Sequence, residues 1–281
     1  MKTNVLLVRC PDQLGIISKI SQCLFDYKAN IIEADQHTSC IQGGEFFLRI
    51  EFCFDESQYS SASIQTAIQK MAQELKAKVS LHDTSEYLRT SILLSHYDHG
   101  LAELLYLWKN KELPIEITSI ISNHDNYGEI AKYHDIPFHF VLADPKENSE
   151  AQILDLVQDN TDFLILARYM QIISESFLNN YGKNIINIHH SFLPSFKGAD
   201  PYRQALERGV KVIGATAHFV TTDLDEGPII AQKVENVTHR DCLDNLKQKG
   251  RILEKHTLAQ AVSNYAEHRI ISCKNKTIVF S

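Results

Sequence analysis

Polar side chains gather at the end of one apolar segment in the second half of the chain, residues 184–202, NIINIHHSFLPSFKGADPY. Asn187 and His189 are two residues apart, so on an extended strand they point to the same face and lie close together. One amide donor and one imidazole can then converge on a single oxygen atom. Lys197 and Gly198 lie in the loop that follows.

A second apolar segment, ATAHFV, carries His218 and leads into an acidic turn. The turn holds three carboxylates, on Asp223, Asp225 and Glu226. Carboxylates on one short turn repel each other. If one of them also lies in a cleft near His189, we expect its pKa to be raised, so that it exchanges protons with a reacting group near neutral pH.

Each of these residues also has an ordinary structural explanation. A single Asn at a strand end is usually a turn former, and a single His is usually a hydrogen-bonded core or surface side chain. His190 is expected to point to the opposite face from His189, and His218 either joins the site or orients its neighbours. The residues therefore form a candidate site only as a group.

The elements that position this group follow from the hydrophobic pattern. The length of 281 residues indicates two domains. In the first part of the chain, up to about residue 83, the hydrophobic pattern predicts a ferredoxin-like βαββαβ order. A glycine turn, Gln42-Gly43-Gly44, is expected between its second and third strands. The expected strands are 4–9, 30–40, 45–54 and 78–81, and the expected helices begin near residues 16 and 64.

After a polar stretch without periodicity, HDTSEYLR, strands and helices alternate regularly. We place the first domain at residues 1–84, a linker at 85–89 and the second domain at 90–281. The alternation predicts a Rossmann-like, mostly parallel α/β sheet covered on both faces, with ligands beyond the carboxyl ends of its strands. The expected strands are 90–94, 115–122, 138–142, 163–167 and 185–189, and a last helix covers about 242–265.

Composition narrows the class of partner. The chain has 28 Lys and Arg against 35 Asp and Glu, a net charge of −7, so we expect a small ligand and neither nucleic acid nor a membrane. The six cysteines form no CxxC pair and the N-terminus has no signal peptide, which predicts a cytoplasmic protein with reduced thiols. No histidine pair has metal-ligand spacing, so no metal site is expected.

The N-terminal segment RCPDQLGIISKISQCLFDYKANIIEADQ resembles the ACT family of small-molecule-sensing domains. The resemblance implies an amino-acid effector bound near the loop before the first helix and, because such sites form between copies, a homo-oligomer. Asp12 and Gly15 precede a helix whose unpaired N–H groups and positive dipole end suit a carboxylate. The alternative is that Asp12 only caps this helix and Gly15 only permits close packing.

Four motifs of the second domain resemble the signature of folate-dependent formyl transfer enzymes: Asn187-Ile188-His189, SFLPSFKG at 191–198, His218-Phe219-Val220 and LDEGP at 224–228. Together with LARYMQIIS at 166–174 and the ACT-like part, they make the whole chain similar to the formyltetrahydrofolate deformylase family. The resemblance implies hydrolysis of the substrate 10-formyltetrahydrofolate to formate and tetrahydrofolate, without a prosthetic group. It also implies a role in balancing one-carbon pools and supplying formate for purine synthesis.

The resemblance also implies residue roles. Asn187 and His189 would stabilise the oxyanion, and Asp225 would take a proton from the attacking water and pass it to the leaving nitrogen. The pteridine would be held largely through backbone groups, at Met170, Gln171, Ile173, Val220 and Thr222. The alternative for residues 169–173 is that they only pack at the start of a helix.

The same trio also serves enzymes that transfer the formyl group to an amine. A phosphorylated acceptor needs a glycine-rich loop after the first strand of this domain, whereas this chain has SHYDHG at 95–100, with bulky side chains and the negative Asp98. We therefore expect water as the nucleophile, with His96, Tyr97 and His99 walling the site against amines. A formyltransferase and a non-enzymatic folate or amino-acid sensor are the alternatives.

Overall fold

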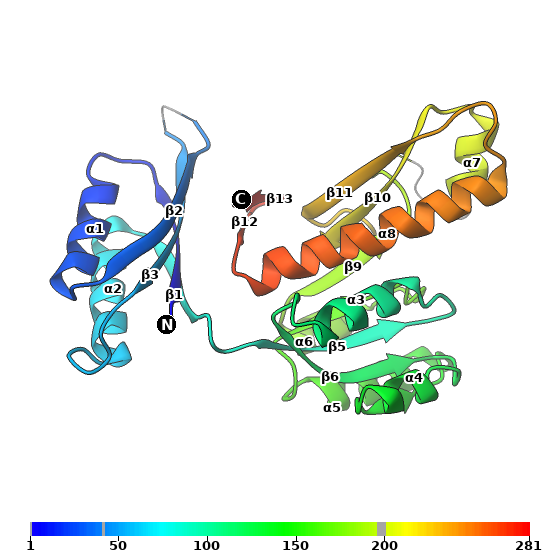
Figure 1. Cartoon of the computed structure of the whole chain (residues 1–281), viewed down its shortest axis with the longest axis horizontal. Coiled ribbons are helices and arrows are strands. Elements are labelled where there is room, and N and C mark those ends of the chain that lie inside the picture. The colour runs from blue at the N-terminus through cyan, green and yellow to red at the C-terminus, as the bar shows by residue number, and fades with distance from the viewer. Residues whose placement is uncertain (1, 41–42, 196–200) are drawn as a thin grey trace. The chain divides into compact units, whose positions relative to one another are not determined.

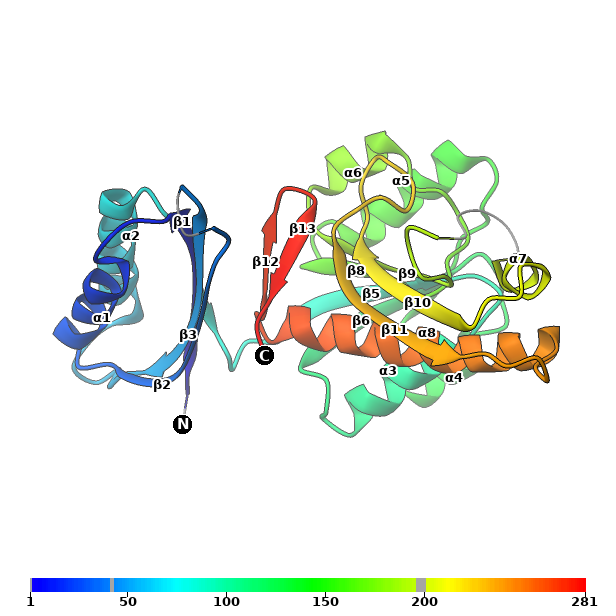
Figure 2. The same ribbon diagram turned by 90° about the horizontal axis from the view of Figure 1, so that it is seen from above.

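The structure is a computed structural model that describes residues 2–40, 43–195 and 201–281. The chain divides into two compact units (Figures 1 and 2). The first comprises Met1–Glu86, Glu267–Cys273 and Ile278–Ser281, and the second comprises Tyr87–Ala266 and Lys274–Thr277.

The first unit is an antiparallel sheet with the strand order β2-β3-β1-β4 and two helices on one face (Figure 2). This arrangement confirms the predicted βαββαβ order, including the β2–β3 hairpin, although Gln42 of its predicted turn lies outside the described residues. The elements are β1 (Asn4–Pro11), α1 (Ile16–Asp26), β2 (Asn30–Thr38), β3 (Glu45–Cys53), α2 (Ser61–Leu75) and β4 (Lys78–Asp83).

Helix α1 begins without a capping side chain from the described residues. Its N-cap is Gly15, in the left-handed conformation with φ 84°, and no side-chain oxygen accepts from its first turn. The alternative in which Asp12 caps this helix is therefore wrong. The helix is held by its buried face, Ile16, Ile20 and Leu24, which packs on the sheet.

The opposite face of this sheet is covered by the C-terminal end of the chain. Val5 and Phe47 pack against Ile271 and Phe280. Residues 267–273 and 278–281 therefore group with the first unit, whereas the sequence boundary places all of 90–281 in the second domain. The physical reason is that an apolar sheet face needs a covering layer, and two short strands, β12 (Ile270–Cys273) and β13 (Lys276–Val279), lie at this end of the chain.

The second unit is a seven-stranded sheet with the order β11-β10-β9-β8-β5-β6-β7 and helices on both faces (Figure 2). Pairs from β7 through β5 to β9 are parallel, and β10 and β11 are antiparallel, which confirms the mostly parallel α/β prediction. The strands are β5 (Leu88–Leu94), β6 (Ile115–Ser122), β7 (Phe138–Phe140), β8 (Phe163–Leu166), β9 (Ile185–His189), β10 (Val212–Phe219) and β11 (Ile229–Asn236).

The helices that flank this sheet in the described part of the chain are α3 (His99–Lys109), α4 (Gly128–Tyr133), α5 (Lys146–Val157), α6 (Glu175–Tyr181), α7 (Pro201–Glu207) and α8 (Leu243–Ala266). Helices α5 and α6 cover one face through a core that includes Ile153, Val157 and Phe177. Helix α8 runs along the other face beside α3 (Figure 1). Among the described residues, no helix has both the length and the apolar character to cross a membrane, and none of the six cysteines forms a disulfide.

Candidate active site

A cleft of about 860 Å³ lies at the carboxyl ends of β8 and β9, where the parallel sheet is expected to present a ligand site. Eight residues selected from the sequence all line it: Met170, Gln171, Ile173, Asn187, His189, Val220, Thr222 and Asp225. Lys197 and Gly198, from the loop after β9, lie outside the described residues.

The centre of the cleft holds an imidazole–carboxylate pair. His189 Nδ1 lies 3.2 Å from Asp225 Oδ2, and the two side chains are only 7% and 15% exposed. The other ring nitrogen, Nε2, is buried and has no hydrogen-bond partner among the described residues. Asp225 therefore orients the ring and leaves Nε2 available to a ligand in the cleft.

His218 joins Asn187 to this pair. It lies directly opposite Asn187 in the antiparallel β9–β10 register, and its Nδ1 donates to the Phe219 carbonyl at 2.9 Å. Its Nε2 lies 3.2 Å from Asn187 Nδ2 and 3.6 Å from Asp225 Oδ1. Of the two roles open to His218, the geometry favours that of a residue that orients its neighbours.

The pKa of Asp225 is set by these imidazoles. Burial alone would raise it, but the hydrogen bond from His189 and the close approach of His218 outweigh burial and hold the pKa well below its ordinary value. The prediction of a raised carboxyl pKa is therefore wrong. Mutual repulsion does not decide it, because Asp223 and Glu226 are exposed and only Asp225 of the three lines the cleft.

A strained turn brings Asp225 back to β9. Asp225 has φ 56°, a left-handed conformation that costs a residue with a Cβ roughly 1–3 kcal/mol. At Gly227 an added Cβ would lie 1.8 Å from the Phe219 carbonyl oxygen, so the turn closes only with glycine. Met170, in the segment after β8, also has a positive φ, of 56°.

The β8–α6 segment divides into a buried and an exposed part. Tyr169 is 4% exposed and packs in the core, whereas Met170 and Gln171 are exposed and line the cleft. Helix α6 begins only at Glu175, after its N-cap Ser174. Packing at a helix start therefore does not account for Met170 and Gln171, which are exposed to the cleft.

Sequence reasoning missed a buried polar cluster at another part of the cleft. Glu254 of α8 is 2% exposed and accepts hydrogen bonds from His99 Nε2 at 2.9 Å and from Tyr202 at 2.6 Å. Arg168 Nε lies 3.6 Å from the same carboxylate, and its guanidinium lies 4.9 Å from the Tyr97 ring centre. Burial would raise the pKa of Glu254, but the bond from His99 and the charge of Arg168 keep it lowered.

The predicted wall of aromatic residues is present in part. Tyr97 and His99 line the cleft, whereas His96 is not among its lining residues and packs 5.0 Å from the His124 ring. A signal for the buried cluster exists in the sequence, since Glu254 stands between apolar residues at helical spacing, but its partners are far away along the chain.

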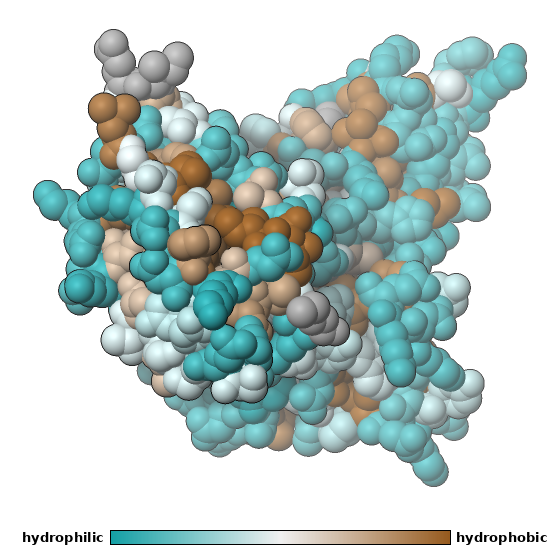
Figure 3. All heavy atoms as spheres, turned by 60° about the vertical axis from the view of Figure 1, so that its left-hand side comes forward, coloured by the Kyte–Doolittle hydropathy of each residue, from teal (hydrophilic) through white to brown (hydrophobic). Residues whose placement is uncertain are grey.

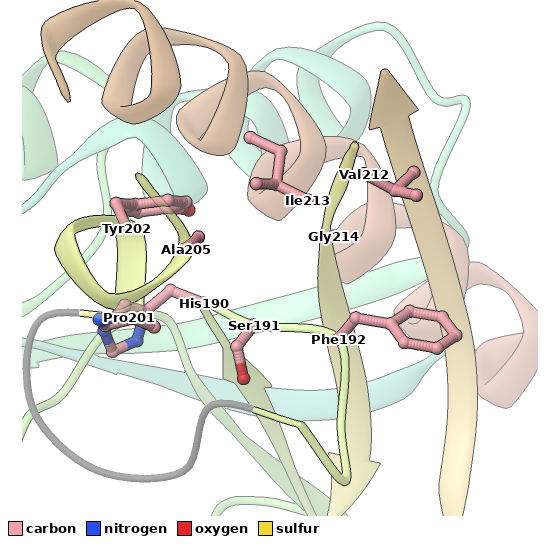
Figure 4. A pocket seen from close by; sticks show the side chains of 9 residues that line it. All are labelled: His190, Ser191, Phe192, Pro201, Tyr202, Ala205, Val212, Ile213 and Gly214. Atoms are coloured by element: carbon pink, nitrogen blue, oxygen red, sulfur yellow. The ribbon is translucent and has the colours of Figure 1, made fainter. Parts of the chain in front are cut away.

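His190 lines the same cleft as His189, so the prediction that it points to the opposite face is wrong. Strand alternation does not apply to it, because β9 ends at His189. Burial, followed by the nearby charge of Arg168, lowers the pKa of His190 to about 4. Its ring lies 6.0 Å from that of Tyr202, on the same side of a small adjoining cavity (Figure 4).

Together these groups suit acyl chemistry. The Asn187 amide and, in the imidazolium form of the ring, His189 Nε2 are two donors for a developing oxyanion, and Asp225 is an ionised carboxylate beside them. Such a set polarises a carbonyl group and activates water without a covalent intermediate. It requires an electrophilic carbon held between the donors and the carboxylate.

Comparison with known proteins agrees with both units. The formyl transferase family profile matches residues 88–262, and the ACT domain profile matches residues 4–58. The chain is 47% identical to the formyltetrahydrofolate deformylase of Bacillus subtilis, over 98% of this chain and 93% of that protein. A crystal structure of a deformylase from Pseudomonas syringae pv. tomato superposes with a TM-score of 0.96 at 40% identity, covering 100% of this chain and 95% of that one.

The chain belongs to the formyltetrahydrofolate deformylase family. A likeness to transferases is also present but is confined to part of the chain. Glycinamide ribonucleotide transformylase 1 from Symbiobacterium toebii has a TM-score of 0.65 at 30% identity, over 69% of this chain and 95% of that one. The deformylase family thus shares the whole two-unit chain, whereas the transformylase shares a part of it.

Proposed function

We propose that this chain hydrolyses 10-formyltetrahydrofolate to formate and tetrahydrofolate, and so balances one-carbon pools and supplies formate for purine synthesis. The observation that carries the proposal is the half-satisfied imidazole of His189, with Nδ1 on Asp225 and Nε2 buried without a partner in the described part of the chain. Membership of the deformylase family supports the substrate. With no disulfide among its six cysteines, the chain suits the reducing cytoplasm, where we place the reaction.

The formyl oxygen accepts hydrogen bonds from the Asn187 amide and His189 Nε2. As water attacks the formyl carbon, the carbonyl electron pair moves to that oxygen, and the two donors stabilise the resulting negative charge. Removal of one such donor typically lowers turnover by about 10²–10³. Asn187 is held for this role by its contact with His218.

Asp225 handles the proton. It receives a proton from the attacking water while the new C–O bond forms, and it then gives that proton to the folate nitrogen as the C–N bond breaks. In the resting site the two imidazoles make Asp225 a weak base. While Nε2 of His189 donates to the growing oxyanion, Nδ1 keeps the Asp225 carboxylate beside the reaction centre.

We assign the pteridine to the part of the cleft lined by Met170, Gln171, Ile173, Val220 and Thr222. The first three belong to the loop after β8, and the other two precede Asp225. The Val220 N–H donates to the Ile185 carbonyl at 2.8 Å, which fixes the start of the second segment. Exposed side chains with accessible backbone groups suit recognition of a heterocycle through its donors and acceptors.

Transfer to an amine is the alternative activity. Against it, the side chains of Tyr97, His99 and Tyr202 line the cleft around the buried Glu254. These side chains take up space that an acceptor substrate needs. Water requires no such space.

We further propose that the first unit is a regulatory and oligomerisation domain and that the second unit is the catalytic domain. In the first unit, large apolar side chains remain exposed just before α1, on α1 and on the edge strand β2, namely Leu14, Ile17, Phe25, Ile31 and Ile32. Figure 3 looks toward this unit and shows apolar residues gathered among polar ones. An unpaired strand edge with exposed apolar residues suits pairing with a second copy.

Two measurements test this role. Ile32→Glu should lower the molar mass seen by light scattering, whereas an unchanged mass would exclude β2 as the contact between copies. A panel of amino acids should alter the rate of formate release through the unit. If none alters it, the effector proposal is wrong and the unit serves assembly only.

The test of the proposed function is formate release without an acceptor. The purified chain is mixed with 10-formyltetrahydrofolate alone, and formate is measured with a coupled formate dehydrogenase. We expect formate and tetrahydrofolate in equal amounts. No product without an amine, together with turnover when glycinamide ribonucleotide is added, would establish the transferase instead. Folate binding without turnover under either condition would indicate a sensor.

A further inference from the structure

The cleft contains a buried cation that the proposed hydrolysis does not use. Arg168 is 9% exposed and lines the cleft together with Asn187 and His189. Its Nε and Nη1 atoms are buried and have no hydrogen-bond acceptor among the described residues. Buried guanidinium groups are normally hydrogen-bonded, so two unused donors in a ligand cleft point to a missing acceptor.

The neighbours of Arg168 do not supply that acceptor. Glu254 Oε1 accepts from Tyr202, and Oε2 accepts from His99. Arg168 Nε lies 3.6 Å from Oε2, which is an ion-pair contact beyond hydrogen-bond distance. Glu254 therefore balances the charge of Arg168 while leaving its directional donors unused.

The backbone holds Arg168 firmly in place. Its carbonyl accepts from the Ser95 N–H at 3.1 Å, and its φ is 66°, in the left-handed region that favours glycine. The Tyr97 ring lies 4.9 Å from the guanidinium carbon. A strained, anchored backbone and an aromatic neighbour fix the direction of the side chain before any ligand binds.

We propose that Arg168 forms a carboxylate subsite that receives the formate released beside Asn187 and His189. The proposal rests on the proposed hydrolysis. Formate is a planar carboxylate with two oxygens. A guanidinium presents parallel N–H pairs from Nη2 with either Nε or Nη1, so one formate takes up one of the two unused donors together with Nη2. The His190 ring lies 5.2 Å from the His189 ring and is near enough to Arg168 for its charge to act on the imidazole, so His190 adjoins both groups.

The glutamate part of the folate itself also carries carboxylates, and it is the alternative ligand for Arg168. The buried position of Arg168 favours the smaller ion. An outcome of the experiment below separates the two sources.

The test is inhibition by added sodium formate, with sodium chloride as the ionic-strength control. We expect Arg168→Gln to raise the formate inhibition constant roughly 10- to 100-fold, the usual effect of losing hydrogen bonds to a charged group. Arg168→Gly is the second variant, because glycine relieves the backbone strain at this position and so favours folding. Lys247→Gln is the matched control: it removes the same charge from an exposed residue of the same cleft and should change the constant less than about twofold.

Binding is also measured without turnover, by titrating ¹³C-formate into the tetrahydrofolate-bound protein and following its NMR signal. The subsite is overturned if formate binds the Arg168 variants as tightly as the parent. It is also overturned if formate does not bind the parent. If formate binds the parent through Arg168 but the parent releases no formate from 10-formyltetrahydrofolate, the hydrolysis is refuted and the anion subsite remains supported. If Arg168→Gln raises KM for the full substrate, but not for 10-formyltetrahydropteroate, and leaves formate inhibition unchanged, Arg168 binds the glutamate instead.

Discussion

Replacement of Asp225 by Asn tests the proposed chemistry most directly. The carboxylate faces two imidazoles, at 3.2 Å from His189 and 3.6 Å from His218, and its side chain is 15% exposed. Asn has nearly the same shape and tolerates the φ of 56° at this position. The substitution therefore removes the charge and the basicity while leaving the turn in place.

The expected loss follows from two effects. General base catalysis by a positioned side chain is worth about 10²–10⁴ in rate. The charge-assisted hydrogen bond that orients His189 is worth about 1.5–3 kcal/mol, or roughly 10- to 100-fold. Because both effects act through one carboxylate they do not add fully, and we expect kcat to fall by about 10³ or more with little change in KM.

The assay is formate release measured by a coupled dehydrogenase, with Asp223→Asn as the matched control. Asp223 loses the same charge two residues away but is exposed and outside the cleft, so that variant should keep the activity of the parent. Formate release by Asp225→Asn above about a tenth of the parent rate would refute the role of Asp225.

Stability gives an independent readout of the same substitution. The folded-state pKa of Asp225 lies below its unfolded value, so its ionised form stabilises the protein above about pH 4, and this contribution is lost as the pH falls through the folded-state pKa. Asp225→Asn should therefore be less stable than the parent at pH 7, by about 1–3 kcal/mol. The two proteins should approach each other only in strong acid, as followed by urea unfolding.

Two further predictions concern other parts of the molecule. In Gly250→Ala the new Cβ would lie 2.0 Å from the Tyr202 hydroxyl, so urea unfolding should show a loss of about 1–3 kcal/mol, and a gain from better helix propensity would contradict the packing argument. His82 and His268 stack at 3.8 Å in the first unit, and burial lowers both pKa values, that of His268 to about 3. Their neutral stack stabilises the fold above about pH 6.5 and is lost as the pH falls toward 3, so His268→Asn should flatten the decline of unfolding free energy in that range, and an unchanged slope would show that the pair does not titrate on unfolding.

Much of the fold could be predicted from hydrophobic periodicity, because long elements carry it. The alternation in β3 and the helical spacing of α1 and α2 are local properties, and both the ferredoxin-like order and the parallel sheet followed from them. Some short elements were predicted, such as β7 and β8, but α7 and β12 were missed. Helix α7 has seven residues and β12 has four, too few to show a period, and their formation depends on the surfaces they cover.

The candidate site likewise has one part that local sequence predicts and another part that it does not. Asn187 and His189 could be placed on one face because they are two residues apart on a single strand. The contact of Asp225 with His189 and the ion pair of Arg168 with Glu254 join segments far apart in the chain. The residue pattern within one helix or strand does not predict a contact between segments so far apart in the sequence.

The amino-acid sequence by itself determined which groups are available and which neighbours along one strand share a face, since bond geometry and strand pleat settle both. The family resemblance selected Asp225 among the three carboxylates, but only the tertiary structure decided how close it lies to His189, and hence that its pKa falls rather than rises. It also decided that Arg168, which lines the cleft, has two donors without an acceptor among the residues that the structure describes. Charge interactions and desolvation depend on distances between separate segments and on the exclusion of water, and these exist only once the chain has folded.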